Sequence, residues 1–153
     1  MPIDLSRWVP EVHDRFIADT KSNVGYIVHD NGSYTMFRIG SGKNSEVWYL
    51  GRRYNAHTPE RVWKVESITY QTDHITFAKS GEFLRLYTDG ESTPYGIHAT
   101  QNINEMLTWE DRYKSMGCIL VSNDVLQVLA HTYVMNGNKL EVATVEGLST
   151  IDP

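Results

Sequence analysis

Residues 115–125 of this chain read Ser115-Met116-Gly117-Cys118-Ile119-Leu120-Val121-Ser122-Asn123-Asp124-Val125. Ser122 or Asn123 can cap a helix, because a side-chain oxygen there accepts a backbone N–H that the first helical turn leaves free. Asp124 adds a negative charge at the positive end of the helix dipole. We therefore predict a helix over 122–134, stopped by turn residues at 136–138. Its predicted buried face consists of Val125, Leu126, Leu129, Tyr133 and Val134.

Short strand-like segments lie on both sides of this helix. Residues 26–29 and 34–39 are rich in β-branched and aromatic residues, and Asp30-Asn31-Gly32-Ser33 between them is typical of a hairpin turn. Residues 140–145 alternate as a final strand. The sequence therefore predicts a mainly β fold with one or two helices, an α+β chain. Further strands are predicted at 47–50, 62–65, 74–77, 83–87 and 95–98.

The chain has room for one domain, because 153 residues match the usual size of a single compact unit. Apolar residues near the N-terminus recur at helical spacing, which indicates a short amphipathic helix packed on that domain. These residues are Val9, Val12, Phe16 and Ile17. We therefore divide the chain into an N-terminal helical arm over 1–23, a main domain over 24–147 and a C-terminal tail over 148–153.

Composition and charge exclude several classes of protein. The chain carries 14 Lys and Arg against 19 Asp and Glu, a net charge of −5, and has no basic run to neutralise nucleic acid phosphates. Its single cysteine cannot close an intramolecular disulfide. No apolar run reaches the roughly 18 residues that a membrane-spanning helix needs. We therefore expect neither a nucleic acid partner nor a membrane span.

Cys118 is the first candidate for chemistry. Its place in a loop just before a helix can turn backbone amides toward a bound carbonyl oxygen, and positive potential there favours the thiolate. The alternative is that a lone cysteine is a small buried hydrophobe. A cysteine nucleophile needs a base. Of the six histidines, His98 stands out because it ends a predicted strand, where side chains commonly reach a cleft.

Metal binding is the competing use of the histidines. The sequence has no His-x-His, no His-Glu-x-x-His and no second cysteine for a common zinc site. Gly40-Ser41-Gly42-Lys43 lacks both the spacing and the following helix of a phosphate-binding loop. We therefore expect no metal and no cofactor.

Three motifs follow one another along the chain: Gly96-Ile97-His98-Ala99-Thr100, Ser115-Met116-Gly117-Cys118-Ile119 and Ser122-Asn123-Asp124-Val125. Together they resemble the L,D-transpeptidase (YkuD-type) catalytic domain family, which has a His-Gly-Thr-like strand end and then a cysteine signature about twenty residues later. Thr58-Pro59 looks like the Thr-Pro element of that family. The resemblance implies a YkuD-like β-sandwich or β-roll in which the cysteine loop precedes a helix.

This resemblance implies acyl transfer on the peptide stems of peptidoglycan. Cys118 would attack the carbonyl of the third stem residue and expel the terminal D-alanine, and His98 would carry the thiol proton to the leaving amine. The Ala99 carbonyl would hold the imidazole tautomer. Amides of Gly117 and Cys118 would form the oxyanion hole, and Ser115 would brace the loop.

Two residues depart from the pattern of the family. Met116 stands at the signature histidine, and Leu120 stands at the usual arginine. The leucine removes a cation that could hold a substrate carboxylate. The insertion over 102–113 would either wall the cleft or form an exposed loop. The substrate-binding residues implied are Ser115, Tyr95, Thr100, Met116 and Trp109.

The acceptor would determine the reaction. A stem amine gives a cross-link, a free D-amino acid gives exchange, and water gives L,D-carboxypeptidation. Residues 1–8 show charges where a secretion leader would be apolar. A removed leader, a fragment of a longer protein and an effector injected without a leader all fit. We favour the effector, made in the cytoplasm and acting in the periplasm of a target cell, with an immunity protein or secretion-machine component as partner.

A second class of function is a non-enzymatic cell-wall-binding module of the same fold. Under this hypothesis Met116 and Leu120 are substitutions in a site that has lost its catalytic activity. A decayed site would have little reason to keep the rest of the motif, which favours an enzyme. The retained residues are Ser115, Gly117, Cys118 and His98.

Overall fold

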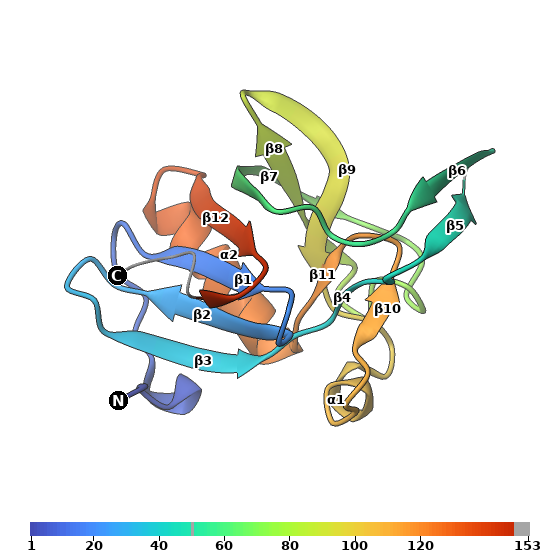
Figure 1. The fold of residues 1–153 in the computed structure, drawn as a ribbon. Helices are drawn as coiled ribbons and strands as arrows, with labels where there is room; N and C mark the ends of the chain where they lie inside the picture. The colour runs from blue at the N-terminus through green and yellow to red at the C-terminus, as the bar shows by residue number, and fades with distance from the viewer. Residues whose placement is uncertain (50, 149–153) are drawn as a thin grey trace.

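The computed structural model describes residues 1–49 and 51–148 of the chain (Figure 1). Its largest element is a curled sheet of eight strands. These are β1 (Arg15–Asp19), β2 (Val24–Val28), β3 (Tyr34–Arg38), β7 (Arg61–Tyr70), β8 (Glu82–Thr88), β9 (Glu91–His98), β11 (Ile119–Leu120) and β12 (Leu140–Val145). Across the sheet they follow the order β11-β9-β8-β7-β12-β1-β2-β3.

Two small sheets and three helical segments complete the fold. One sheet pairs β4 (Ser41–Gly42) with β10 (Tyr113–Ser115), and the other pairs β5 (Glu46–Tyr49) with β6 (Arg52–Asn55) as a projecting hairpin (Figure 1). The helical segments are a 3-10 turn (Leu5–Arg7), α1 (Ile103–Met106) and α2 (Asn123–Met135). The predicted fold class, mainly β with helices, is confirmed.

Helix α2 follows the sequence-based prediction closely. The Ser122 hydroxyl accepts the Val125 N–H at 3.2 Å, as expected of an N-cap. Four of the five predicted core residues are buried, whereas Val134 is 63% exposed. Val134 directly follows the buried Tyr133, and one helical step of about 100° turns its side chain away from the sheet. Thr132 is buried instead, and its hydroxyl donates to the Val128 carbonyl.

The hydrophobic core forms where α2 packs against the main sheet, with residues from β1, β2, β7, β8, β9, β11 and β12. Full burial of one large apolar side chain contributes about 1.5–3 kcal/mol to folding. The largest fully buried side chains include Trp63, Phe16, Ile27, Ile39, Leu84 and Leu86.

The N-terminal segment corrects one prediction, because residues 15–19 form strand β1 and not a helix. Strand β1 lies inside the sheet, parallel to β12 and antiparallel to β2. Phe16 and Ile17 are both buried, since a central strand has both faces covered, and such a strand cannot be told from a buried helix by periodicity. Val9 and Val12 are exposed. A helical arm over 1–23 is therefore wrong, and a boundary at 24 would cut β1 from its own sheet.

Two other predictions concern a strand at 74–77 and a tail at 148–153. Residues 74–77, predicted as a strand, form turns between β7 and β8. Asp73 explains this, because its carboxylate accepts the Ile75 and Thr76 N–H groups and the Thr76 hydroxyl, which folds the backbone back on itself. The predicted tail over 148–153 lies, apart from its first residue, outside the described residues.

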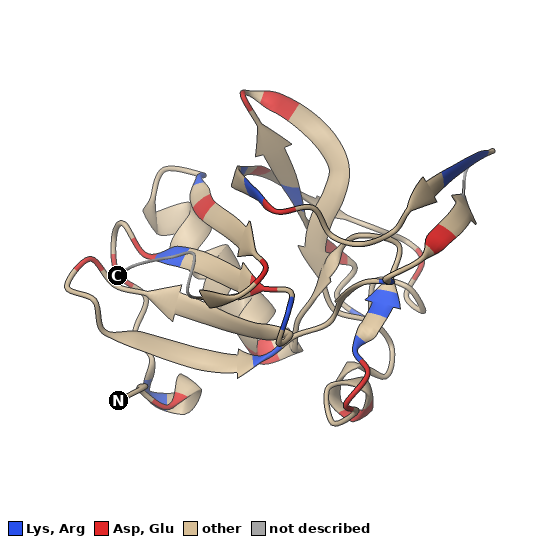
Figure 2. Ribbon diagram, in the orientation of Figure 1, with Lys and Arg blue, Asp and Glu red and all other residues tan. Residues whose placement is uncertain are grey.

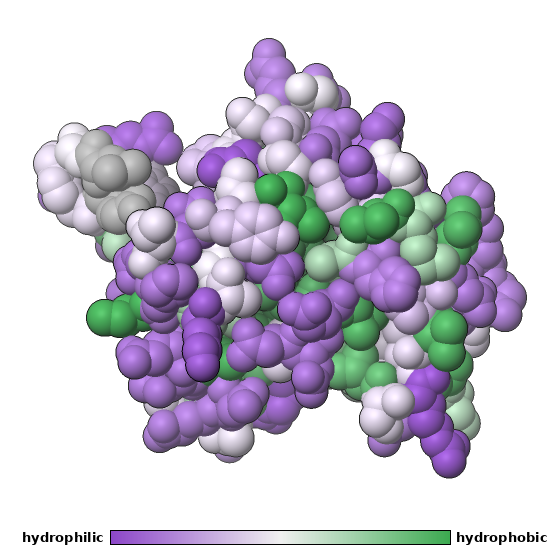
Figure 3. All heavy atoms as spheres, turned by 180° about the vertical axis from the view of Figure 1, so that it is seen from behind, coloured by the Kyte–Doolittle hydropathy of each residue, from purple (hydrophilic) through white to green (hydrophobic). Residues whose placement is uncertain are grey.

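The surface carries charges of both signs. Acidic and basic positions are interspersed along the ribbon, and the free end of the β5–β6 hairpin is basic (Figure 2). On the face opposite to that of Figure 1, hydrophobic residues lie in separate spots among hydrophilic ones (Figure 3). Within residues 1–49 and 51–148, no helix has the length and apolar character needed to cross a bilayer.

Gly42 in β4 gives a first testable prediction. A Cβ at this position would lie 1.7 Å from the Ala56 carbonyl oxygen, and backbone cannot move aside as a side chain can. We expect Gly42→Ala to lower the free energy of unfolding by about 3 kcal/mol, measured by chemical denaturation. Gly137→Ala is the control, because its Cβ would meet nothing within 4 Å, and only its φ of +69° would cost about 1 kcal/mol. Equal losses in the two variants would contradict the packing argument.

Candidate active site

Parallel pairing of β9 and β11 brings Cys118 and His98 into one region. Ile119 pairs with Ile97 and Leu120 pairs with His98, so Cys118 adjoins Gly96, two residues before the histidine. Successive side chains in a strand alternate between faces. Cys118 and His98 therefore lie on one face of the sheet, diagonal to each other, while Ile97 and Ile119 point into the core.

The thiol of Cys118 is half-buried. Burial raises its pKa to about 11, and the Gly96 backbone N–H and the charge of Arg85 act in the opposite direction. At neutral pH the resting side chain is thus a thiol and not a thiolate. A nucleophile in this environment depends on a base that removes its proton as it attacks.

His98 is buried, and its Nδ1 lies 2.8 Å from the Ala99 carbonyl oxygen. Since a carbonyl only accepts, Nδ1 carries the proton in the neutral ring and Nε2 keeps its lone pair. Burial lowers the pKa of His98, while the carbonyls of Ala99 and Thr76 oppose this shift. The rings of Phe77 and Phe83 pack against the imidazole, with centroids at 4.7 and 5.8 Å. The site therefore favours a neutral histidine that can accept a proton through Nε2.

The cysteine loop is braced by Ser115. Its hydroxyl donates to the Cys118 carbonyl oxygen at 2.6 Å and accepts the Gly117 N–H at 3.1 Å. Gly117 has a φ of +129°, and a Cβ there would lie 2.5 Å from Cε1 of Tyr95, so the position requires glycine. These two bonds hold the cysteine loop through Ser115. The oxyanion hole expected from the Gly117 and Cys118 amides stays a prediction.

Thr58 holds the same loop from the other side. Its side chain is fully buried, and its Oγ1 accepts the Gly42 N–H at 2.9 Å and donates to the Gly117 carbonyl oxygen at 2.8 Å. This carbonyl belongs to the same planar peptide unit as the Cys118 N–H. Thr58 therefore fixes the direction in which the amide of the cysteine points.

We expect Thr58→Val to lower kcat about tenfold with little change in KM, because valine keeps the shape of threonine but leaves the Gly117 carbonyl unpaired. Thr58→Ser keeps the hydroxyl and is expected to restore most of the rate. Steady-state kinetics on both variants, with their unfolding curves, test this. If both variants had equal kcat, the hydroxyl would have no positioning role.

The other predicted binding residues are distributed around the loop. Tyr95 packs against Gly117, and Met116 is 36% exposed with its carbonyl accepting the Tyr54 hydroxyl. Thr100 is half-buried and its carbonyl accepts the Ile103 N–H at the start of α1. Trp109 is 44% exposed, and its ring contacts Lys114.

The insertion over 102–113 is anchored to the rest of the fold and is not a bare exposed loop. Ile103 and Met106 of α1 are buried in the core. The buried Arg112 donates to the carbonyls of Ile39, Ser22, Asn23 and Trp109, which anchors the segment to the β3–β4 connection and the β1–β2 turn.

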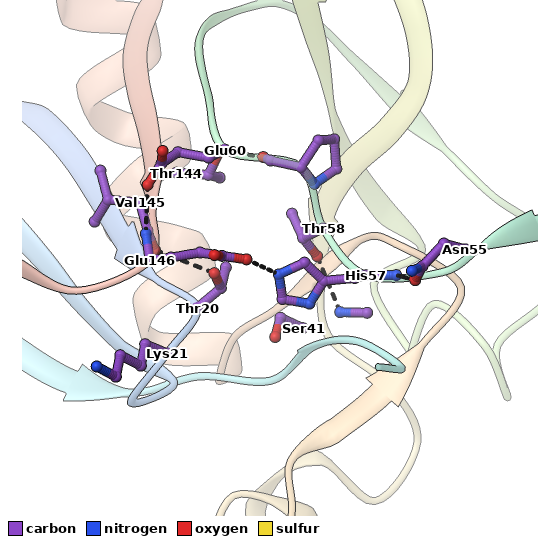
Figure 4. A network of polar contacts seen from close by, with 12 residues as sticks. Thr20, Lys21, Ser41, Asn55, His57, Thr58, Glu60, Thr144, Val145 and Glu146 are labelled. Carbon is purple, nitrogen blue, oxygen red and sulfur yellow. Dashed lines mark hydrogen bonds and ion pairs between the residues drawn. The ribbon is translucent and has the colours of Figure 1, made fainter. Parts of the chain in front are cut away.

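A polar cavity of about 480 Å³ lies beside β4, and no sequence motif indicates it. His57 Nε2 pairs with the Glu146 carboxylate there, 89 residues away in sequence (Figure 4). His57 Nδ1 is buried and has no hydrogen-bond partner among the described residues. No local motif marks such a pair. The cavity is lined by Thr20, Lys21, Asn44, Asn55, His57, Tyr113 and Glu146.

Potential metal ligands gather in one group within the described part of the chain: Glu11, Asp14 and His29. Asp14 Oδ1 bonds to His29 Nδ1 at 2.6 Å, and its Oδ2 accepts the Glu11 N–H at 2.8 Å. The His29 ring stacks on Trp8. Both carboxylate oxygens of Asp14 thus serve the fold. This group is separate from Cys118.

A family model decides the family to which the domain belongs. The YkuD model, described as the L,D-transpeptidase catalytic domain, matches residues 13–142. The chain belongs to this family. The match begins before β1, which agrees with the place of that strand within the YkuD sheet. A search of the curated proteins finds no match.

Solved structures show the same YkuD fold. The L,D-transpeptidase of Xylanimonas cellulosilytica superposes with a TM-score of 0.62 at 20% identity, over 88% of this chain and 61% of that one. Bd1075 of Bdellovibrio bacteriovorus gives 0.59 at 15%, over 88% and 48%. The helical cell shape determining protein Pgp2 of Campylobacter jejuni gives 0.57 at 16%, over 87% and 48%. The chain thus spans about half to three fifths of these structures.

Proposed function

We propose that this YkuD domain is a cysteine acyltransferase that acts on tetrapeptide stems of peptidoglycan. The observation that supports this best is the placement of Cys118 and His98 on one face of adjacent strands, where Nδ1 of the histidine is bound to the Ala99 carbonyl. That bond leaves Nε2 as the basic nitrogen. The same placement favours an enzyme over a wall-binding module, which would need neither a base nor a braced cysteine loop.

In the proposed reaction the Cys118 sulfur forms a bond to the carbonyl carbon of the third stem residue. The thiol proton passes to His98 Nε2 as the sulfur attacks, and then to the nitrogen of the leaving D-alanine when the C–N bond breaks. The Cys118 N–H donates to the oxyanion, because the Gly117 N–H is committed to Ser115. An acceptor amine or water then gives its proton to His98 and takes the acyl group, which frees the thiol.

The burial of Cys118 supports a second candidate, the wall-binding module. A thiol with a pKa of about 11 is a weak nucleophile unless substrate binding brings His98 to it. If the protein is an enzyme, the thiol reacts only after a stem has bound in the site. In the binding module, no substrate activates the thiol.

The proposal also includes delivery of this enzyme into a target cell. An enzyme that trims or rewires the wall of a competitor would act in the periplasm, and its producer would need an immunity protein. Expression of the domain with a periplasmic leader in a test bacterium should cause lysis or altered cell shape, and the Cys118→Ala variant should not. Harmless wild-type protein in the periplasm would argue against the effector role.

Incubation with tetrapeptide-stem muropeptides, with and without a free D-amino acid, tests the chemistry. Mass spectrometry of the products distinguishes loss of alanine, exchange and dimer formation. We expect at least one of these with wild type and none with Cys118→Ala. If folded wild type gave no product in any mixture, the acyltransferase proposal would fail and the binding module would replace it.

A further inference from the structure

Leu120, which stands at the usual arginine of the family, cannot supply a cation to the site. Leu120 is buried in the core cluster, and its backbone N–H and carbonyl both bond to Gly40. A substrate carboxylate near Cys118 must therefore find its positive partner on another strand. Arg85 of β8 is in the right place.

The sheet register aligns Arg85 with the cysteine. Arg85 pairs with Gly96 across β8 and β9, and Cys118 adjoins Gly96 on the other side of β9. The three residues thus form one row on one face of the sheet. The middle residue has no side chain, and the Phe83 ring fills its place, since a Cβ at Gly96 would lie 2.2 Å from Cζ of Phe83.

The guanidinium of Arg85 is held in position and is not neutralised. Its Cζ lies 4.9 Å from the centroid of the Phe83 ring, and its Nη1 donates to the Thr93 carbonyl at 2.7 Å. Among the described residues, no Asp or Glu forms an ion pair with it. An arginine has five N–H donors in a planar fork, so most of them stay available for a ligand.

We propose that Arg85 binds a carboxylate of the acyl donor beside Cys118 and so selects stems that end one residue after the bond to be cleaved. This assignment rests on the proposed acyl transfer. The expelled D-alanine carries its free carboxylate on the carbon next to the leaving nitrogen. A cation in the row of the nucleophile can hold this carboxylate during attack, and a longer or amidated stem would lose the ion pair. The charge of Arg85 also favours the thiolate.

Alkylation of Cys118 tests the anion site without turnover. Iodoacetate and iodoacetamide both transfer a carbon to sulfur and release iodide, but only iodoacetate carries a carboxylate. The ratio of their rates at Cys118, followed by mass spectrometry of the intact protein, is expected to fall about tenfold in Arg85→Met. Arg85→Lys should keep most of the ratio, because the charge remains.

Arg61→Met is the matched control, since this exposed arginine also lies over an aromatic ring, Trp63, but on β7 beside β12. It should leave the ratio unchanged. A ratio that is the same in Arg85→Met and wild type would overturn the proposal.

Stem peptides separate this proposal from the proposed function. With a free terminal carboxylate, Arg85→Met should raise KM about tenfold, whereas with an amidated terminus wild type and variant should be alike. Wild type could show the expected ratio of iodoacetate to iodoacetamide rates and still process no stem. This result would overturn the proposed acyl transfer but would support the anion site. If Arg85→Met raised KM equally on the stem with a free carboxylate and on the amidated stem, the proposed selectivity would be overturned.

Discussion

Cys118→Ala is expected to abolish product formation from tetrapeptide stems while leaving the fold intact. The sulfur forms the acyl bond, and no other cysteine can replace it. The half-buried thiol contributes modestly to packing, so the free energy of unfolding should change by about 1 kcal/mol or less. Mass spectrometry of products and a denaturation curve on one protein preparation measure both.

Cys118→Ser is the control for this prediction, because it replaces the thiol by a hydroxyl of similar size. A serine without a stronger base should be nearly as inactive as alanine. Residual turnover in Cys118→Ala would show that another group carries the reaction. A large loss of stability with normal turnover would mean that the cysteine is a core residue only.

His98→Gln is expected to lower kcat about 10²–10⁴-fold, the usual contribution of a positioned general base. Glutamine can keep a hydrogen bond to the Ala99 carbonyl but cannot take a proton. Its rate should be compared with that of His131→Gln, which changes an exposed histidine of α2. If His98→Gln and His131→Gln were equally active, His98 would not be the base.

The pH profile gives an independent test of His98. Burial lowers its pKa from the ordinary value of 6.5, so the neutral, basic form persists to lower pH than in a free histidine. The rate of wild type should therefore fall with decreasing pH only below about 6.5. Folding also favours the neutral ring, so stability present above pH 6.5 is lost as the pH falls. In His98→Gln both dependences should weaken.

Helix α2 and strand β12 could be predicted because their signals are local. The Ser122 cap and the alternation of residues 140–145 lie within a few positions of the elements that they define. The central strand β1 could not, since both of its faces are covered and its apolar residues mimic a helical period. The turns at 74–77 were missed because the hydrogen bonds of Asp73 override the β-propensity of isoleucine and phenylalanine there.

The residues of the candidate site also differ in whether a local motif or only the tertiary structure indicates them. Cys118, Ser115 and His98 could be proposed because they stand in motifs, and the family that these motifs predict is confirmed. Thr58 was noted only as part of a Thr-Pro element, and its bonds to Gly42 and Gly117 depend on tertiary structure. Arg85 could not be found, because its alignment with the cysteine needs the register of three strands.

The pairing of β1 with β12 has a consequence for biosynthesis. Arg15 pairs with Glu141, so β1 must wait for a strand that is synthesised 126 residues later in the chain (141 − 15). Until residue 145 has left the ribosome, β1 lacks one neighbour and its edge is open to other chains. A polypeptide that emerges slowly from the ribosome would thus complete this sheet only after β12 has emerged. Chaperones that protect edge strands should bind the nascent chain near Phe16.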